Sequence, residues 1–336
     1  MPSVKKTKLV FFIYRLGGGG AARTMLNIVN NINKDKYEPI LVTLNFEYDY
    51  DQFVDPDVTF VKLKTKRLRK AIFELANYLR EEKPDLLFST VLTYNIVAAL
   101  AVKLSRTKVK LVVREAALLR GESKGERLKI RIARRLYNQS AAVVALSQGV
   151  KDNLINYYRT KENLVHVIYN PVDLDHIEAE RLEKVEAELV QVRKQYESVI
   201  VSAGRFVKEK DQITLLRAFA KVRQRNNACL ILLGEGELED RLKEEAERLN
   251  LADSVHFIGF RQNPYAIFNL ADIFALTSTT EGFGHVLVEA LATETLVVST
   301  DCKPGAREVL VNGEYGFLAE VGDPNQVASQ IEKAIH

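Results

Sequence analysis

Short hydrophobic runs alternate with amphipathic stretches along the whole chain. The runs have the length of buried strands, and the stretches between them place apolar residues three and four positions apart, as one face of a helix does. A regular alternation of this kind predicts parallel sheets with helices on both faces. The predicted strands are 9–14, 39–44, 86–89, 110–113, 141–146, 198–203, 228–233, 255–258, 273–276 and 296–299, and the predicted helices include 21–31, 69–81, 125–137 and 213–225.

This alternation is interrupted near residues 170–173, where Pro171 breaks regular structure. We therefore predict two α/β domains, 1–172 and 173–336, and a charged surface helix within 174–197 at the start of the second. The 336 residues, of which 47% are hydrophobic, are sufficient for two cores. Parallel sheets bind ligands outside the carboxyl ends of their strands. We expect two Rossmann-like domains that face each other across a cleft lined by such residues.

The segment 279–300, TTEGFGHVLVEALATETLVVST, carries the most specific chemistry. Gly282, Phe283 and Gly284 lie between a predicted strand and a predicted helix. Such a turn presents the amide N–H groups of a helix N-terminus to a phosphate or a polar sugar. Glu281 and Glu289 flank the turn, and carboxylates accept hydrogen bonds from sugar hydroxyls. Amides for phosphate and carboxylates for hydroxyls together predict a nucleotide-sugar site.

This segment resembles the signature of the retaining glycosyltransferases of family 4, the bacterial group 1 glycosyltransferases, which have the GT-B architecture. Segment 202–211, SAGRFVKEKD, is similar to the family's strand and loop with an Arg and a Lys five residues apart. Segment 169–173, YNPVD, is similar to its entry into the second domain. The three motifs follow the family's order and span nearly the whole chain. Family members usually continue past a stretch like 327–335 with a helix that returns to the first domain.

The resemblance implies a retaining hexosyltransferase that uses a UDP-sugar and needs no metal or other cofactor. Arg205 and Lys210 would stabilise the negative charge on the departing UDP, a role that two preorganised cations can fill without a metal ion. Glu281 would orient the donor sugar, and these three are the candidate catalytic residues. Glu289 would bind the ribose. The resemblance also implies front-side transfer without an established enzymic nucleophile.

Three further glycine-containing turns are candidate donor-binding segments. The run 17–20 follows the first predicted strand, but its glycine spacing fits a dinucleotide fingerprint only loosely and no acidic residue ends the second strand. We interpret it as a loop that closes over the donor diphosphate and the acceptor. Segment 233–238, LGEGEL, resembles a loop that lines the family's nucleotide pocket, and the backbone of 259–261 would bind the uracil. A flexible loop and plain tight turns are the alternatives. The donor-binding residues so predicted are Gly18, Gly19, Gly234, Gly236, Phe260 and Arg261.

Polar residues also follow two strands of the first half, at positions expected to line the acceptor side of the cleft. Ser89 and Asn95 come after strand 86–89, and Arg114 and Glu115 come after strand 110–113. Many family members have a His or a Glu-Arg pair where Arg114 and Glu115 stand, so a catalytic role does not transfer to them. Segment 301–310, DCKPGAREVL, resembles a loop of members that transfer N-acetylhexosamines to lipid-linked acceptors.

The net charge of +4 conceals two halves of opposite sign. Residues 1–172 hold 30 Lys and Arg against 16 Asp and Glu, a net +14, whereas residues 173–336 hold 18 against 28, a net −10. A positive first half favours an anionic partner. Its basic stretches, 62–80 and 124–135, predict contact with an anionic membrane. The acceptor that the resemblance implies there is a lipid-linked saccharide or an oligosaccharide. Ordinary solvated helix faces are the alternative.

The remaining features concern metal, location and rival functions. Asp49, Tyr50 and Asp51 form a D-x-D triplet in a polar loop, which we interpret as surface rather than a metal site. Two isolated cysteines and no spanning segment favour the cytoplasm, on the inner face of the plasma membrane. A GT-B epimerase is disfavoured by the segment around Glu281, and a nicotinamide dehydrogenase by the glycine spacing. A basic module that binds a membrane or nucleic acid would not need Arg205, Lys210, Glu281 and Glu289 together. Nucleic-acid binding is also disfavoured because the basic stretches contain no aromatic stacking motif.

Overall fold

The computed structural model describes residues 5–17, 20–118, 121 and 123–336. By its internal contacts the chain divides into two units, Met1–Pro171 and Val172–His336. The division falls one residue before the predicted boundary. Each unit is built around its own parallel sheet, as the alternation of strands and helices predicts.

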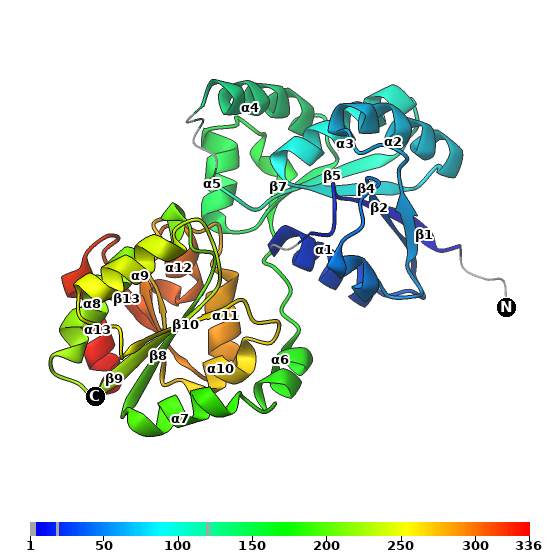
Figure 1. The fold of residues 1–336 in the computed structure, drawn as a ribbon. Helices are drawn as coiled ribbons and strands as arrows, with labels where there is room; N and C mark the ends of the chain where they lie inside the picture. The colour runs from blue at the N-terminus through cyan, green and yellow to red at the C-terminus, as the bar shows by residue number, and fades with distance from the viewer. Residues whose placement is uncertain (1–4, 18–19, 119–120, 122) are drawn as a thin grey trace. The chain divides into compact units, whose positions relative to one another are not determined.

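The first unit, coloured from blue to green in Figure 1, has a seven-stranded parallel sheet in the order β3-β2-β1-β4-β5-β6-β7. Its strands are β1 Thr7–Phe12, β2 Tyr37–Thr43, β3 Thr59–Lys62, β4 Leu86–Thr90, β5 Lys110–Glu115, β6 Ala142–Ala145 and β7 Val165–Val167. Its helices are α1 Gly20–Asn31, α2 Leu68–Glu82, α3 Leu92–Ser105, α4 Lys124–Tyr137 and α5 Gln148–Asn156, with short 3-10 turns η1 Asp49–Phe53 and η2 Glu162–Leu164.

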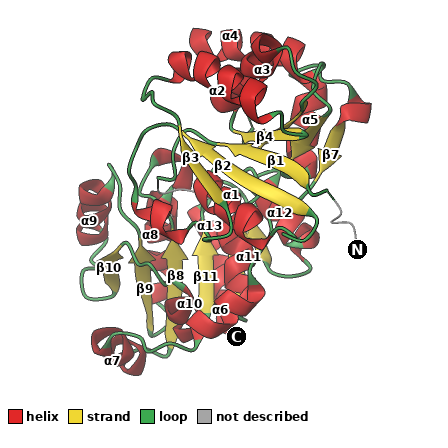
Figure 2. Ribbon diagram, turned by 90° about the vertical axis from the view of Figure 1, so that its right-hand side faces the viewer, coloured by secondary structure: helices red, strands yellow, loops and turns green. Residues whose placement is uncertain are grey.

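Helices cover both faces of this sheet, with α2, α3, α4 and α5 on one side and α1 on the other (Figure 2). Strand β1 shows why both layers are needed. Val10 and Phe12 pack with the first group of helices, whereas Leu9 and Phe11 pack with α1. Successive side chains of a strand point to opposite faces, so an uninterrupted apolar run requires cover on both.

The second unit repeats this architecture with a six-stranded parallel sheet in the order β10-β9-β8-β11-β12-β13. Helices α8, α9 and α13 pack on one face, and α6, α7, α10, α11 and α12 on the other. Its strands are β8 Ser198–Ala203, β9 Ala228–Leu233, β10 Val255–Gly259, β11 Ile273–Leu276, β12 Leu296–Thr300 and β13 Phe317–Ala319. Its helices are α6 Leu174–Arg181, α7 Ala187–Gln195, α8 Gln212–Arg223, α9 Glu239–Arg248, α10 Tyr265–Leu270, α11 His285–Ala292, α12 Gly305–Val309 and α13 Pro324–Ile335, with 3-10 turns η3 Lys208–Lys210 and η4 Val311–Gly313.

Several strand ends are shifted by one or two residues from the prediction, as in β1, predicted at 9–14 and observed at Thr7–Phe12. Two further differences concern whole elements. Strands β3, β7 and β13 were not predicted; each has three or four residues and lies at the edge of its sheet. An edge strand pairs on one side only and carries a short, partly exposed pattern that leaves little periodic signal. The charged segment 174–197 forms two helices, α6 and α7, instead of one. Across the described residues, no helix combines the length and apolarity needed to cross a bilayer.

Candidate functional site

The strand order reverses once in each sheet, between β1 and β4 in the first unit and between β8 and β11 in the second. Ligands of doubly wound sheets bind outside the carboxyl ends of the strands at such a switch point. In the second unit, Arg205 and Lys210 follow β8, and Glu281 follows β11. The topology therefore brings the three predicted catalytic residues to the switch point of their sheet.

Lys210 and Glu281 are joined directly. The Lys210 Nζ lies 2.5 Å from Glu281 Oε1, and the hydroxyl of Ser278 donates to the same oxygen at 2.7 Å. The two charged side chains are 21% and 16% exposed, so they are largely shielded but still reach solvent. Thr277 Oγ1 donates to the carbonyl oxygen of Asp211 at 2.9 Å, which ties the turn after β11 to the turn after β8. Two loops thus fix one cation and one carboxylate beside each other.

Arg205 lies in the same turn and is exposed. Its neighbour Phe206 is 1% exposed and anchors the turn, because the Phe206 amide donates to the carbonyl oxygen of Glu235 at 2.9 Å. The Arg205 carbonyl oxygen accepts a hydrogen bond from Gln212 Nε2 at 3.0 Å. The backbone of the turn is therefore held firmly, while the guanidinium extends from it to solvent.

Gly234 and Gly236 follow β9 and pack against that Arg205 turn. A Cβ atom on Gly234, whose φ is +135°, would lie 2.0 Å from the carbonyl oxygen of Gly204. A Cβ atom on Gly236 would lie 2.5 Å from the carbonyl oxygen of Phe206. Close contact between two loops is thus a sufficient reason for both glycines. Their predicted role in lining the nucleotide pocket stays a prediction.

The Gly-Phe-Gly turn caps α11 as the sequence predicts. Gly284 is the N-cap residue with φ +83°, a left-handed conformation that favours glycine. Gly282 and Phe283 precede it, and a Cβ atom on Gly305 of α12 would lie 2.7 Å from the carbonyl carbon of Phe283. The amide of Gly305 donates to the carbonyl oxygen of Glu281 at 3.3 Å. The turn is wedged between two helices, and this fixes the N-terminus of α11 at the carboxyl edge of the sheet.

Glu289 lies in α11 and is 7% exposed. The Tyr265 hydroxyl donates to Glu289 Oε1 at 3.2 Å, and His285 Nε2 lies 3.7 Å from the same oxygen. Sequence reasoning missed both neighbours. His285 directly follows the Gly-Phe-Gly turn, and its spacing of four residues from Glu289 could have revealed it. Tyr265 comes from α10 and carried no such signal.

Phe260 and Arg261 follow β10 and differ in what they contact. Phe260 is 64% exposed, and Gly259 before it has φ +72°. The Arg261 Nε donates to Glu186 Oε1 at 2.8 Å, and its guanidinium also donates to the carbonyl oxygen of Ile258. The Arg261 side chain thus ties the strand end to the start of α7. Binding of uracil by the backbone of this segment stays a prediction.

In the first unit, Asn95 and Glu115 form a buried polar network. The Asn95 Nδ2 donates hydrogen bonds to Glu115 Oε1 at 3.0 Å and to the carbonyl oxygen of Arg114 at 2.9 Å. The Tyr137 hydroxyl donates a hydrogen bond to Glu115 Oε1. Glu115 is 2% exposed, and burial raises the pKa of its carboxyl to about 7, although the Tyr137 and Asn95 hydrogen bonds lower it. The network fixes the end of β5 from inside the domain. The acceptor role predicted for these residues remains a prediction.

Arg114 and Ser89 are buried beside this network. Arg114 donates to Thr90 Oγ1 at 2.9 Å and to the side-chain oxygen of Asn170, which joins the ends of β4 and β5 to the residue before Pro171. Burial lowers the pKa of Arg114 to about 10, and the charge of Glu115 opposes this shift, so the guanidinium stays charged at neutral pH. The Ser89 hydroxyl is buried and has no hydrogen-bond partner among the described residues, and the same holds for the side-chain oxygen of Asn95.

The other predicted sites have plainer outcomes. Gly18 and Gly19 lie outside the described residues. Within the D-x-D triplet, Asp51 Oδ2 lies 2.6 Å from Lys62 Nζ and so is already paired with a cation. In the described part of the chain, no group of three or more His, Cys, Asp or Glu side chains is placed to hold a metal ion.

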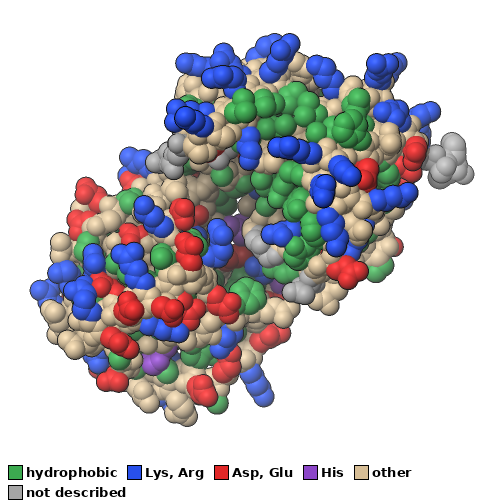
Figure 3. All heavy atoms as spheres, turned by 45° about the horizontal axis from the view of Figure 1, so that its top comes forward, with side chains coloured by type: hydrophobic (Ala, Val, Ile, Leu, Met, Phe, Trp, Pro, Cys, Tyr) green, Lys and Arg blue, Asp and Glu red, His purple; other side chains and the backbone are tan. Residues whose placement is uncertain are grey.

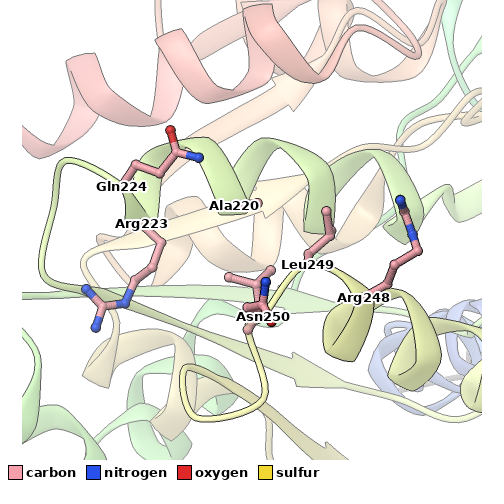
Figure 4. Close-up of a pocket in the computed structure, with 7 residues that line it drawn as sticks. Ala220, Arg223, Gln224, Arg248, Leu249 and Asn250 are labelled. Atoms are coloured by element: carbon pink, nitrogen blue, oxygen red, sulfur yellow. The ribbon is translucent and has the colours of Figure 1, made fainter.

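A pocket near the ends of α8 and α9 contains none of the predicted site residues (Figure 4); it is lined by Ala220, Arg223, Gln224, Arg248, Leu249, Asn250 and Leu251.

Comparison with known protein families decides the class of this arrangement. Residues 18–176 match the family model described as Glycosyltransferase Family 4, and residues 186–336 match the model described as Glycosyl transferases group 1. The chain belongs to the group 1 glycosyltransferases of family 4. The two matches follow one another along the chain and divide at the same region as the two structural units.

Similar proteins agree with that assignment. The Campylobacter jejuni enzyme named N-acetylgalactosamine-N,N'-diacetylbacillosaminyl-diphospho-undecaprenol 4-alpha-N-acetylgalactosaminyltransferase is 28% identical over 95% of this glycosyltransferase and 88% of its own length. The Staphylococcus aureus capsular polysaccharide biosynthesis glycosyltransferase CapM is 29% identical over 58% of this chain and 52% of its own. The crystal structure of Anabaena HepE in complex with UDP-glucose is 25% identical, with a TM-score of 0.79 over 98% of this chain and 90% of that chain. The glycosyltransferase therefore has the GT-B fold, built from two Rossmann-like domains.

Proposed function

We propose that this glycosyltransferase moves a sugar from a UDP-sugar with retention of anomeric configuration and without a metal ion. The observation that carries the proposal is the pair of Lys210 and Glu281, 2.5 Å apart at the switch point of the second sheet. An ammonium group there offers counter-charge to a diphosphate, and a carboxylate there accepts hydrogen bonds from sugar hydroxyls. Arg205, exposed in the same turn, supplies a second cation.

In the proposed reaction, the bond between the anomeric carbon and the UDP oxygen breaks as a bond forms to the acceptor hydroxyl oxygen on the same face. The hydroxyl proton passes to the departing diphosphate, so atoms and charge balance without another reactant. Lys210 and Arg205 stabilise the charge that develops on UDP. Glu281 exchanges its contact with Lys210 for contacts with the donor sugar. Glu289, anchored by Tyr265, accepts hydrogen bonds from the ribose hydroxyls.

The relatives support the choice of substrates. HepE was crystallised with UDP-glucose, which favours a UDP-sugar donor. The name of the Campylobacter relative specifies an N-acetylgalactosaminyl group and a diphospho-undecaprenol acceptor. We therefore propose an N-acetylhexosamine donor and a lipid-linked saccharide acceptor, in the synthesis of a cell-surface polysaccharide. In segment 301–310 the guanidinium of Arg307 holds Asp301 through two hydrogen bonds, which stabilises this loop beside the Gly-Phe-Gly turn.

The surface of α2 and α4 supports contact with an anionic membrane. Leu128 and Ile132 of α4 are 56% and 39% exposed, and Phe73 of α2 is 62% exposed. The buried face of α4 is formed by Ile130, Ala133, Leu136 and Tyr137, so Leu128 and Ile132 lie outside the core-facing side of the helix. Figure 3 shows apolar side chains gathered between Lys and Arg side chains on this face of the first unit. Apolar side chains beside basic ones are typical of helices that rest on anionic lipid.

We place the enzyme on the cytoplasmic side of that membrane. The cytoplasmic leaflet carries the anionic lipids that attract basic segments. The described cysteines, Cys229 and Cys302, are both free and buried. Burial raises the pKa of Cys229 to about 12 and that of Cys302 to about 11, so both stay protonated as packed thiols at neutral pH.

The experiment measures UDP release and product formation with a panel of UDP-sugars in buffer with EDTA, then with added Mn²⁺ or Mg²⁺. We expect activity in EDTA, and the product should keep the anomeric configuration of the donor by NMR. Lys210→Ala should lower turnover about a hundredfold, as loss of a preorganised charge stabiliser does. Lys221→Ala, which removes an exposed lysine from α8, is the matched control. Full activity of Lys210→Ala, or strict dependence on a divalent cation, would contradict the proposal, and the latter would return attention to residues 49–51.

A further inference from the structure

Four aromatic side chains gather at the carboxyl edge of the first sheet. Tyr14 follows β1, Phe46 and Tyr48 follow β2, and Tyr94 lies in the first turn of α3, just after β4. The strand order reverses between β1 and β4, so Tyr14 and Tyr94 lie on the two sides of the switch point. This is the place in a doubly wound sheet at which ligands bind.

The four rings form a continuous row, which we call the aromatic row. Tyr14 stacks on Tyr94 with centroids 5.6 Å apart and planes 17° apart. Tyr14 also contacts Phe46 at 5.0 Å, and Phe46 contacts Tyr48 at 6.0 Å. Tyr14, Phe46 and Tyr94 pack on the core beneath, and all four residues are only partly buried. The row therefore has one side fixed by the domain and one side open to solvent.

Two exposed cations lie over these rings. The Arg15 guanidinium carbon is 5.0 Å from the ring centroid of Tyr48 and 5.9 Å from that of Tyr14, and Arg15 donates a hydrogen bond to the Tyr48 hydroxyl. The Lys66 ammonium is 5.9 Å from the centroid of Phe46. Burial raises the pKa of Tyr94, and the positive charge of Arg15 opposes this rise. The Arg15 side chain is thus positioned by aromatic faces while its planar group stays accessible.

The aromatic row also borders Gly17, the first residue of the glycine run after β1. A Cβ atom on Gly17 would lie 3.4 Å from Arg15 Nε and 3.5 Å from the ring of Tyr48. The chain at Gly17 therefore passes directly over the cationic end of the row. The same segment was predicted from the sequence to lie over the donor diphosphate and the acceptor.

The second unit contains another arginine beside a tyrosine ring, at a position where no ligand is expected. Arg223 lies 5.5 Å from the ring centroid of Tyr196, almost the distance seen for Arg15. Tyr196 immediately precedes β8, so this pair lies at the amino end of a strand, where sheet ligands do not bind. The Tyr196 ring meets the edge of the His256 ring at 6.4 Å rather than a row of three further aromatic rings. The Arg223 guanidinium donates to the carbonyl oxygen of Asn226 at 3.2 Å. The Arg15 cluster differs in both position and extent.

We propose that the aromatic row, with Arg15 and Lys66, binds the glycosyl phosphate portion of the acceptor. This inference rests on the proposed function and assigns its acceptor subsite. The C–H face of a pyranose packs against the negative face of an aromatic ring, and the guanidinium fork matches two oxygens of a phosphate. The same chemistry is present in a lipid-linked sugar diphosphate and in a free sugar phosphate.

The test uses the full chain and three probes: N-acetylglucosamine linked through diphosphate to a short prenyl chain, N-acetylglucosamine 1-phosphate, and UDP. Affinities are measured by calorimetry for wild type, Arg15→Ala, Tyr14→Leu, Tyr48→Phe and the control Arg223→Ala. Arg15→Ala and Tyr14→Leu should each weaken binding of the sugar phosphates about tenfold or more and leave UDP affinity unchanged. Tyr48→Phe keeps the ring but loses the hydrogen bond to Arg15, and its loss should be smaller. Arg223→Ala should bind every probe as wild type does.

Each outcome is decisive. If the variants bind the prenyl probe and N-acetylglucosamine 1-phosphate equally weakly, the aromatic row recognises the glycosyl phosphate itself. If only the affinity for the prenyl probe falls, the row recognises the lipid-linked form. Unchanged affinity for both sugar phosphates in Arg15→Ala and Tyr48→Phe overturns the inference, and so does a loss of UDP affinity instead. If Arg15→Ala does not fold, the ring-preserving Tyr48→Phe decides alone. A wild-type chain that neither binds UDP nor cleaves any UDP-sugar would refute the proposed function first, independently of the row.

Discussion

Glu289 is almost buried, yet it belongs to the turn and helix that form the predicted donor site. If its carboxylate accepts hydrogen bonds from the ribose, Glu289→Ala should weaken binding of UDP as well as of the UDP-sugar. Loss of a hydrogen bond to a charged group costs about 1.5–3 kcal/mol, or roughly ten- to hundredfold in affinity. Calorimetric titration with UDP checks this, with the exposed Glu294→Ala as control. Equal UDP affinity in wild type and Glu289→Ala would exclude the ribose contact.

Glu115 gives the first domain a pH-dependent stability. In the folded state its pKa is about 7, above the usual carboxyl value, because burial disfavours the charged carboxylate. The folded state then holds the proton more tightly than the unfolded state, so this group contributes stability at low pH that is lost as pH rises through about 7.

Urea unfolding of wild type and Glu115→Gln at pH 5 and pH 8 tests this sign. Wild type should lose stability across this range, by at most about 3 kcal/mol from this group, and Glu115→Gln should lose less because it has no proton to release. The exposed Glu162→Gln should behave as wild type. A steeper loss of stability in Glu115→Gln than in wild type would show that the shift has the wrong direction.

At the scale of elements, the loops after β8 and β9 depend on glycine. Gly234→Ala would place a Cβ atom 2.0 Å from the carbonyl oxygen of Gly204, in a backbone conformation with φ +135°. Backbone strain of this kind costs about 1–3 kcal/mol unless the loops separate, and separation would displace Arg205. We expect Gly234→Ala to lower both the melting temperature and the turnover.

Gly125→Ala is the matched control for that variant. Gly125 lies in α4, where the nearest side-chain atom to an added Cβ is 4.0 Å away. Alanine favours a helix over glycine by about 1 kcal/mol, so this variant should be as stable as wild type or more so. If Gly234→Ala and Gly125→Ala have the same melting temperature, the close contact between the loops carries no strain.

At the scale of the whole molecule, the first 172 residues carry +14 and the remainder −10. The proposed membrane contact uses this charge together with the exposed apolar residues of α4. Each basic residue near an anionic surface contributes about 1 kcal/mol, and the attraction decays over a Debye length of about 8 Å at physiological salt. Binding to vesicles should therefore need anionic lipid, be reversible, and weaken steeply as salt rises.

Charge reversal of one helix tests that contact by vesicle sedimentation. Replacement of the four arginines 127, 131, 134 and 135 of α4 by Glu should abolish binding to anionic vesicles and leave UDP affinity intact. The matched control reverses four exposed lysines of the second domain, which should keep vesicle binding; they are Lys184, Lys194, Lys221 and Lys333. Equal sedimentation with neutral and anionic vesicles would leave the arginines as ordinary solvated surface.

The local structure and the chemistry of single segments could be predicted from the order of the amino acids. Strands such as Ser198–Ala203 and Ile273–Leu276 were predicted at their observed bounds, because a fully buried strand is a continuous apolar run between polar ends. The Gly-Phe-Gly turn, the start of α11 and the family resemblance were likewise readable, since each depends on neighbours in sequence. Tertiary structure decided what depends on partners far along the chain. Three such contacts join segments far apart in the sequence: Lys210 with Glu281, Glu115 with Tyr137, and Tyr14 with Tyr94. They form because strand order is set by packing, which the periodicity of the sequence does not encode.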